Sequence, residues 1–150
     1  MKYDSENLWS SGDNKLTTQE VFESIKDYVE KGGTIYVGTD SMLRHDFCKF
    51  ASVIAIHSNE FKIADYFFKK KSLPAYQYKA LRNKIYEEVD CSVQIADELS
   101  KYFPHSQIEV HVDVGKTNRS KTRIYVDTLR GWVTGMGFKF KIKPNSWASH

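Results

Sequence analysis

The spacing of hydrophobic residues along the chain predicts three helices. The first begins where Thr17 and Glu20 have the spacing of a capping box, and it ends at the glycine pair Gly32-Gly33. Apolar residues three and four positions apart predict a long helix over about residues 76–102 and a last helix over about residues 120–136. The residues expected on the inner sides of these two helices are Ile85, Val89, Val93, Ala96 and Leu99, and then Ile124, Leu129, Trp132, Val133 and Met136.

Short stretches rich in β-branched and aromatic residues predict five strands between the helices. Short polar links join the first three strands, which favours an antiparallel meander. The last strand alternates Phe and Lys, a pattern typical of a sheet edge. The resulting order, α-β-β-β-α-β-α-β, predicts an α/β fold with a mixed sheet and helices on its faces. The five strands are expected at residues 34–40, 50–56, 61–68, 108–114 and 138–143, within one domain over residues 17–150 that follows a polar leader over residues 1–16.

Two aspartates, Asp40 and Asp113, lie at the ends of predicted strands. If those strands are parallel neighbours, the two carboxylates meet at one edge of the sheet. Two nearby carboxylates repel, and a divalent cation such as Mg²⁺ or Mn²⁺ relieves that repulsion. The long helix offers Glu87, Glu88 and Asp90 for a third carboxylate, and its spacing alone neither chooses between them nor excludes a solvated helix face.

The same segments resemble the YkuK-like group of the ribonuclease H-like family. The resemblance covers roughly residues 17–149 and is most specific from His111 to Ser146. It implies the ribonuclease H-like fold, a five-stranded mixed sheet built from three antiparallel strands followed by helix, strand, helix and strand. The segments that carry it are Val-Gly-Thr-Asp-Ser at 37–41, Tyr-Glu-Glu at 86–88, His-Val-Asp-Val-Gly at 111–115, Asn-Arg-Ser-Lys-Thr-Arg at 118–123, Gly-Met-Gly at 135–137 and Lys-Pro-Asn-Ser at 143–146.

By this resemblance, Asp40, Glu88 and Asp113 are the catalytic carboxylates that hold Mg²⁺ or Mn²⁺, with Glu87 as the alternative to Glu88. Nucleases of the superfamily usually carry a fourth acidic or histidine ligand after the last strand. In that region this sequence offers Asn145, a weak metal ligand, and His150 as another candidate. The resemblance therefore implies a metal-dependent nuclease and leaves its fourth ligand open.

The charge of the chain is unevenly distributed. Residues 115–150 carry eight Lys and Arg against one acidic residue, whereas the first 114 residues carry 14 basic and 18 acidic residues. Basic side chains at the start of a helix oppose its dipole, and a polyanion would relieve that mismatch. A solvated lysine-rich surface is the alternative. The residues expected to contact nucleic-acid phosphate are Lys116, Asn118, Arg119, Lys121 and Arg123.

Composition narrows the class of protein. The chain is 41% hydrophobic and 14% aromatic, which excludes a mainly disordered chain. Its apolar runs fall short of the roughly 20 residues that span a membrane, and its start lacks the apolar core of a signal peptide. Two cysteines fit a reducing compartment, so we expect a cytoplasmic protein.

The sequence thus favours a nucleic-acid-binding, metal-dependent phosphodiester hydrolase. One alternative is a catalytically impaired module of the same fold that binds nucleic acid or a protein partner. Another is an enzyme on the same scaffold that acts on a small phosphorylated molecule.

Overall fold

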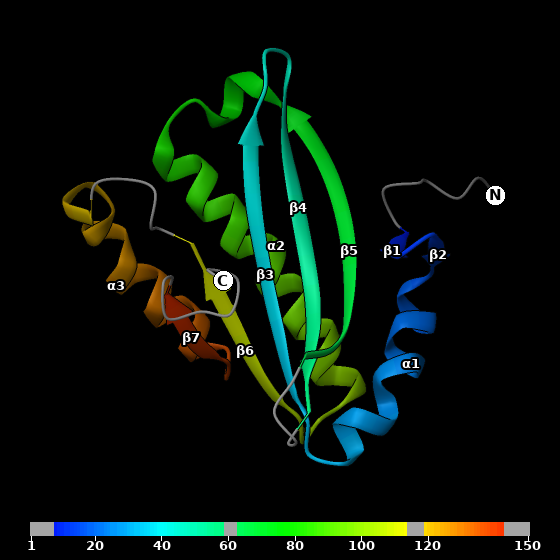
Figure 1. Ribbon diagram of the computed structural model, residues 1–150. Coiled ribbons are helices and arrows are strands. Elements are labelled where there is room, and N and C mark those ends of the chain that lie inside the picture. The colour runs from blue at the N-terminus through cyan, green and yellow to red at the C-terminus, as the bar shows by residue number, and fades with distance from the viewer. Residues whose placement is uncertain (1–7, 59–62, 114–118, 143–150) are drawn as a thin grey trace.

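The structure is a computed structural model that describes residues 8–58, 63–113 and 119–142 (Figure 1). Its order of helices and strands agrees with the α-β-β-β-α-β-α-β prediction, with two short strands added at the start. In chain order the elements are β1 (Trp9–Ser11), β2 (Asn14–Leu16), α1 (Thr18–Glu30), β3 (Thr34–Leu43), β4 (Phe47–His57), β5 (Ile63–Pro74), the 3₁₀ helix η2 (Ala75–Tyr78), α2 (Leu81–Tyr102), β6 (Gln107–Val112), α3 (Arg119–Gly135) and β7 (Lys139–Ile142).

Within the described ranges, seven strands form one mixed sheet in the order β2-β1-β5-β4-β3-β6-β7. The pairs β3–β6 and β6–β7 are parallel, and the other neighbours are antiparallel. The five neighbouring strands β5, β4, β3, β6 and β7 are those predicted from the sequence. The α/β class and the antiparallel meander are therefore confirmed. The placement of the last strand at a sheet edge is confirmed as well.

The hairpin of β1 and β2 differs from the loose leader expected for residues 9–16. It extends the sheet because Ser10 pairs with Phe68 of β5. Trp9 is 1% exposed, and its indole N–H donates a hydrogen bond to Thr18 Oγ1 at 3.2 Å. One buried tryptophan therefore attaches a segment that is too short and too polar to show a hydrophobic period.

The helix α1 begins and ends as the sequence predicts. The Thr17 hydroxyl accepts a hydrogen bond from the Glu20 N–H at 3.2 Å, and the Glu20 carboxylate accepts one from the Thr17 N–H at 2.9 Å. At the other end Gly32 has a φ of +90°, in the left-handed region that favours glycine. A Cβ on Gly33 would lie 2.7 Å from the carbonyl oxygen of Tyr28. Both glycines are therefore needed for the turn into β3.

The helix α2 starts later than predicted. Residues 75–78 form the separate 3₁₀ helix η2, and Ala80 has an extended backbone with φ −85° and ψ 136°. The helix therefore begins at Leu81. The residues expected on its inner side are all buried, as predicted: Ile85, Val89, Val93, Ala96 and Leu99.

The helix α3 has a narrower buried side than predicted. Leu129 and Val133 are buried, but Ile124 is 70% exposed and Met136 is 43% exposed. The reason is that α3 packs against the edge strand β7 and one side of α2, which cover only a narrow stripe. In the part of the chain that the structure describes, no helix is both long and apolar enough to span a membrane.

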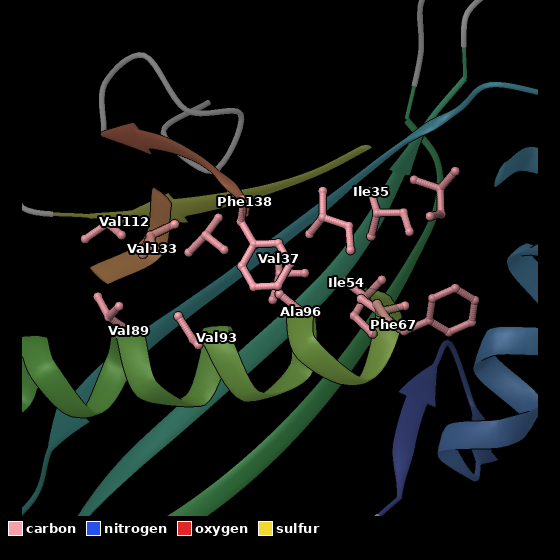
Figure 2. Packing of buried hydrophobic residues seen from close by; sticks show 14 of the residues in the cluster. Ile35, Val37, Ile54, Phe67, Val89, Val93, Ala96, Val112, Val133 and Phe138 are labelled. Atoms are coloured by element: carbon pink, nitrogen blue, oxygen red, sulfur yellow. The ribbon is translucent and has the colours of Figure 1, made fainter. Parts of the chain in front are cut away.

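One hydrophobic cluster joins the sheet to its helices (Figure 2). Side chains of the central strands, among them Val37 and Ile54, meet those of α2, among them Val93 and Ala96. Buried residues of α1 and α3 belong to the same cluster. The described helices therefore pack on one side of the sheet, and the same cluster holds α2 against β3.

Replacing Trp9 tests whether the hairpin belongs to the folded core. We expect Trp9→Ala to lower the free energy of unfolding by about 3 kcal/mol or more, because a large buried ring leaves a cavity. Equilibrium unfolding in urea measures the change. Ser10→Ala, on the same strand, is the control and should change stability by less than about 0.5 kcal/mol. A loss below about 1 kcal/mol for Trp9→Ala would show that the hairpin is dispensable.

Candidate active site

The parallel pairing of β3 with β6 places Asp40 and Asp113 at the same level of the sheet. The pairing runs as far as Gly38 opposite His111, and each aspartate lies two residues further along its chain. Asp40 is exposed on β3, and Asp113 is half-buried directly after the end of β6. The sequence prediction that these strands are parallel neighbours is thus confirmed.

Two contacts fix α2 against β3 beside these aspartates. The Thr39 hydroxyl lies 2.8 Å from the Ser92 hydroxyl, and the Ser41 N–H donates a hydrogen bond to Glu88 Oε2 at 3.1 Å. Two residues along a strand cover about 6.7 Å, and four residues along a helix cover about 6 Å. The two contacts therefore match in spacing, so that Glu88 lies next to the residue that follows Asp40.

Glu88 is a buried carboxylate in a negative environment. It is 9% exposed, and it accepts hydrogen bonds from both the N–H and the hydroxyl of Ser41. Burial raises the pKa of Glu88 to about 7, and the negative charges of Asp40 and Asp113 also raise it, while the hydrogen bonds from Ser41 act in the opposite direction. Both predicted aspartates therefore lie near enough to Glu88 for their charges to raise its pKa.

Glu87, the sequence alternative to Glu88, has a different set of partners. Its carboxylate forms an ion pair with Lys71 at 3.0 Å and accepts a hydrogen bond from the Tyr78 hydroxyl at 3.2 Å. Burial, with Glu87 as the next cause, raises the pKa of Tyr78 to about 12. Glu87 therefore ties α2 to β5 and η2, and the geometry favours Glu88 as the partner of the two aspartates.

Ser41 is the residue of this site to which the sequence reasoning assigned no role. The alternation of β3 offered a signal, since Thr39 and Ser41 share the side of the strand that faces α2. Glu88 and Ser92, four residues apart, share one side of the helix. What the sequence did not reveal is the alignment of the strand with the helix.

His111, two residues before Asp113, packs in the sheet. It is 6% exposed, its ring centroid lies 4.7 Å from that of Tyr36, and its Nε2 lies 3.3 Å from Glu109 Oε1. Burial lowers the pKa of His111, against the opposing effect of Glu109. These contacts make His111 part of the packing of the sheet.

The predicted phosphate contacts lie mostly outside the described residues. Lys116 and Asn118 fall outside them entirely, as do the fourth-ligand candidates Asn145 and His150. The backbones of Arg119, Lys121 and Arg123 belong to the start of α3, but their side chains are outside the description. Their contact with nucleic acid stays a prediction.

The donor chemistry of the three carboxylates fits a hard divalent cation. Carboxylate oxygens are ligands of Mg²⁺, and a cation would offset the mutual repulsion that raises the pKa of Glu88. Within residues 8–58, 63–113 and 119–142, no three or more His, Cys, Asp or Glu side chains are already grouped so that they could hold a metal ion. The described residues therefore supply suitable ligands without a ready-made cluster.

Comparison with known proteins places the chain in a family. A family model described as "Ribonuclease H-like" matches residues 17–150. The chain belongs to the ribonuclease H-like family. The match runs from the N-cap of α1 through β7, which confirms the resemblance drawn from the sequence.

Two individual proteins show how far the similarity reaches. "Uncharacterized protein YkuK" of Bacillus subtilis (strain 168) is 27% identical over 165 residues, which cover 97% of this chain and 94% of that protein. The protease-reverse transcriptase of prototype foamy virus has a TM-score of 0.39 and 12% identity, over 81% of this chain and 19% of that one. The fold assignment therefore rests on the ribonuclease H-like family match rather than on the viral enzyme.

Substitution of Glu88 tests the repulsion within the carboxylate group. The Glu88 pKa is about 7 in the folded chain against an ordinary value of 4.5. The folded chain therefore holds this proton where the unfolded chain has lost it, so this contribution to stability is complete below about pH 4.5 and lost as the pH rises through 7. In EDTA at pH 8 we expect Glu88→Gln to be more stable than wild type by up to about 3 kcal/mol, at roughly 1.4 kcal/mol per pKa unit.

The neighbouring carboxylate is the matched control. Glu87→Gln removes the ion pair with Lys71, and we expect it to lower stability by about 0.5–1 kcal/mol. Urea unfolding of both variants and the wild type at pH 5 and pH 8 gives the comparison. A Glu88→Gln protein that is less stable than wild type at pH 8 would show that the charged carboxylate is well accommodated.

Proposed function

We propose that the chain is a Mg²⁺- or Mn²⁺-dependent hydrolase of phosphodiester bonds in nucleic acid. Asp40, Glu88 and Asp113 are its metal-binding and catalytic carboxylates. One observation carries the proposal: Asp40, three residues before the end of β3, and Asp113, directly after β6, both raise the pKa of the helix-borne Glu88. Ribonuclease H-like family membership supports this chemistry.

Ser41 and Asp40 would have different roles in this reaction. Ser41 holds the Glu88 carboxylate in place through two hydrogen bonds. Asp40 is exposed, which leaves its oxygens accessible to a substrate that arrives from solvent. A bound divalent cation supplies charge neutralisation and polarises oxygen atoms of phosphate and water.

The basic segment after Asp113 would hold the substrate backbone. Its residues are those that the sequence singled out, Lys116, Asn118, Arg119, Lys121 and Arg123. Ion pairs with phosphates release counterions, so binding through this segment should weaken steeply as salt rises. The divalent cation and the phosphate contacts of the basic segment would together position one phosphodiester beside the carboxylates.

A second function, nucleic-acid or protein binding without cleavage, has one observation in its favour. Among the described residues the carboxylates do not form a group that is ready to hold a metal ion. A protein of this kind would keep the fold and the electrostatic group but would not turn over a substrate. The same assay separates the two functions.

The direct test is cleavage of a labelled panel in the presence of Mn²⁺. The panel contains single-stranded DNA, single-stranded RNA, duplexes of each, an RNA–DNA hybrid and a branched junction. We expect wild type to cleave at least one of these and Asp40→Asn to be about 100-fold slower or worse, because it removes a metal ligand. Asp46→Asn is the control, since that side chain is 85% exposed in the β3–β4 turn.

Each result of the panel has a definite meaning. Cleavage that needs Mn²⁺ and Asp40 but not Asp46 supports the hydrolase. Salt-sensitive binding with no cleavage of any substrate favours the non-catalytic module. Cleavage by Asp40→Asn at the wild-type rate contradicts the assignment of the site.

A further inference from the structure

The side of the sheet opposite the helices carries a surface that the carboxylate site does not explain. The helices of the described part all pack against the other side, in one cluster with Val37, Ile54 and Phe67. Residues alternate between the two sides along each strand. We use the name open face for the side that carries Tyr36 and Gly38 of β3 and the residues in register with them.

One row of the open face crosses all seven strands of the described sheet. At its centre Gly38 and Val53 are small or β-branched, and a Cβ added to Gly38 would lie 3.9 Å from Val53 Cγ1. Next to Val53 stands Phe68, which is 45% exposed although it lies inside the sheet. In order across the sheet, the row is Lys15, Ser10, Phe68, Val53, Gly38, His111 and Lys141.

The next row adds two tyrosines to the same face. Tyr36 and Tyr66 stand on either side of Ala55, and Tyr66 is 39% exposed. The rings of Tyr66 and Phe68 are nearly parallel, with an interplanar angle of 13° and centroids 6.1 Å apart. Ala55 is the small residue between the two tyrosines. Tyr66 and Phe68 stand two residues apart on β5, and their exposed rings offer an aromatic surface on which flat apolar groups can stack.

Lysines frame this aromatic platform. Lys15 and Lys141 end the first row on opposite edges of the sheet, and Lys139 stands on β7 next to Lys141; all three are exposed. Lys70, also exposed, is level with Ala51 in the row that contains Asp40. Six steps of about 4.8 Å between strands give roughly 29 Å from edge to edge. The face therefore presents aromatic rings between edges that carry lysines, with one acidic residue, Glu109, between Tyr36 and Lys139 in the second row.

We propose that the open face binds single-stranded nucleic acid. Unpaired bases stack on aromatic rings such as Tyr66 and Phe68 with little dependence on sequence, and lysines along the edges attract the phosphates. A duplex hides its base faces within its own stack, so it cannot use the rings. Asp40 lies in the row beside this platform, so a strand bound here passes Asp40. This inference needs no cation and stands apart from the proposed hydrolase.

The test is equilibrium binding in EDTA, measured by fluorescence anisotropy. The probes are labelled 12-nucleotide dT and rU strands and a 12-base-pair duplex. We expect wild type to prefer the single strands by at least tenfold in Kd, with a Kd that rises as salt increases. The double variant Tyr66→Ala/Phe68→Ala should raise the single-strand Kd by at least tenfold.

Matched variants separate stacking from loss of fold. Tyr76→Ala removes a tyrosine that is 74% exposed on η2, outside the rows of the open face, and should leave the Kd unchanged. Tyr66→Phe keeps the ring and should bind as wild type does. Lys139→Gln/Lys141→Gln should lower the slope of log Kd against log salt, by about 0.7 for each phosphate that the variant no longer neutralises.

Each outcome of the binding test either supports or overturns the inference. Single-strand binding that needs the Tyr66 and Phe68 rings supports the inference, whether or not the protein cleaves with Mn²⁺. Equal binding of duplex and single strand, or a Kd unchanged in the double variant, overturns it. A wild-type protein that binds no strand but self-associates through Tyr66 and Phe68 also overturns it, because the face is then covered by protein. If Mn²⁺-dependent cleavage is unchanged in the Tyr66→Ala/Phe68→Ala variant, the proposed hydrolase stands and only the inference about the open face is overturned.

Discussion

The parallel register between β3 and β6 is the constraint on which the candidate site depends. Backbone pairing of Gly38 opposite His111 fixes the level of both strands, and the two aspartates follow two residues later. A shift of one residue in either strand would turn one aspartate to the other side of the sheet. The hydrophobic cluster packs α2 against these strands, and the charges of both aspartates raise the pKa of Glu88 on that helix.

The negative charges of these carboxylates repel one another, and that repulsion would favour binding of a divalent cation. A buried carboxylate near two others is destabilised in its charged form, and the two hydrogen bonds from Ser41 act against this. The hydroxyl contact between Thr39 and Ser92 one helical turn away holds α2 in register with β3. The fold therefore supports a concentration of negative charge that a divalent cation would stabilise.

Much of this architecture could be predicted from the sequence because the signals are local. The capping box of Thr17, the period of α2 and the alternation of β7 each act over a few residues, and each is present as predicted. The hairpin at residues 9–16 could not be predicted, since its anchor is one tryptophan that packs against distant elements.

The candidate site was predictable in its residues but not in its contacts. The sequence placed both aspartates at strand ends, which is correct for Asp113, whereas β3 continues past Asp40 to Leu43. The choice of Glu88 over Glu87 depends on how α2 is rotated about its axis. That rotation is set by tertiary packing. It lets Glu88 accept a hydrogen bond from Ser41 and lets Glu87 form an ion pair with Lys71. The open face was also hidden from the sequence, because its rows form only when strands far apart in the chain pair.

Calorimetric titration of the wild-type protein with Mn²⁺ tests most directly whether the three carboxylates act as one site. Asp40→Asn and Asp113→Asn are titrated beside it, with Asp46→Asn as the control in an exposed turn. We expect binding to the wild type and to Asp46→Asn, and an affinity about tenfold or more lower in each of the other two variants. Equal Mn²⁺ affinity in all four proteins, or no binding to the wild type, would contradict a shared metal site.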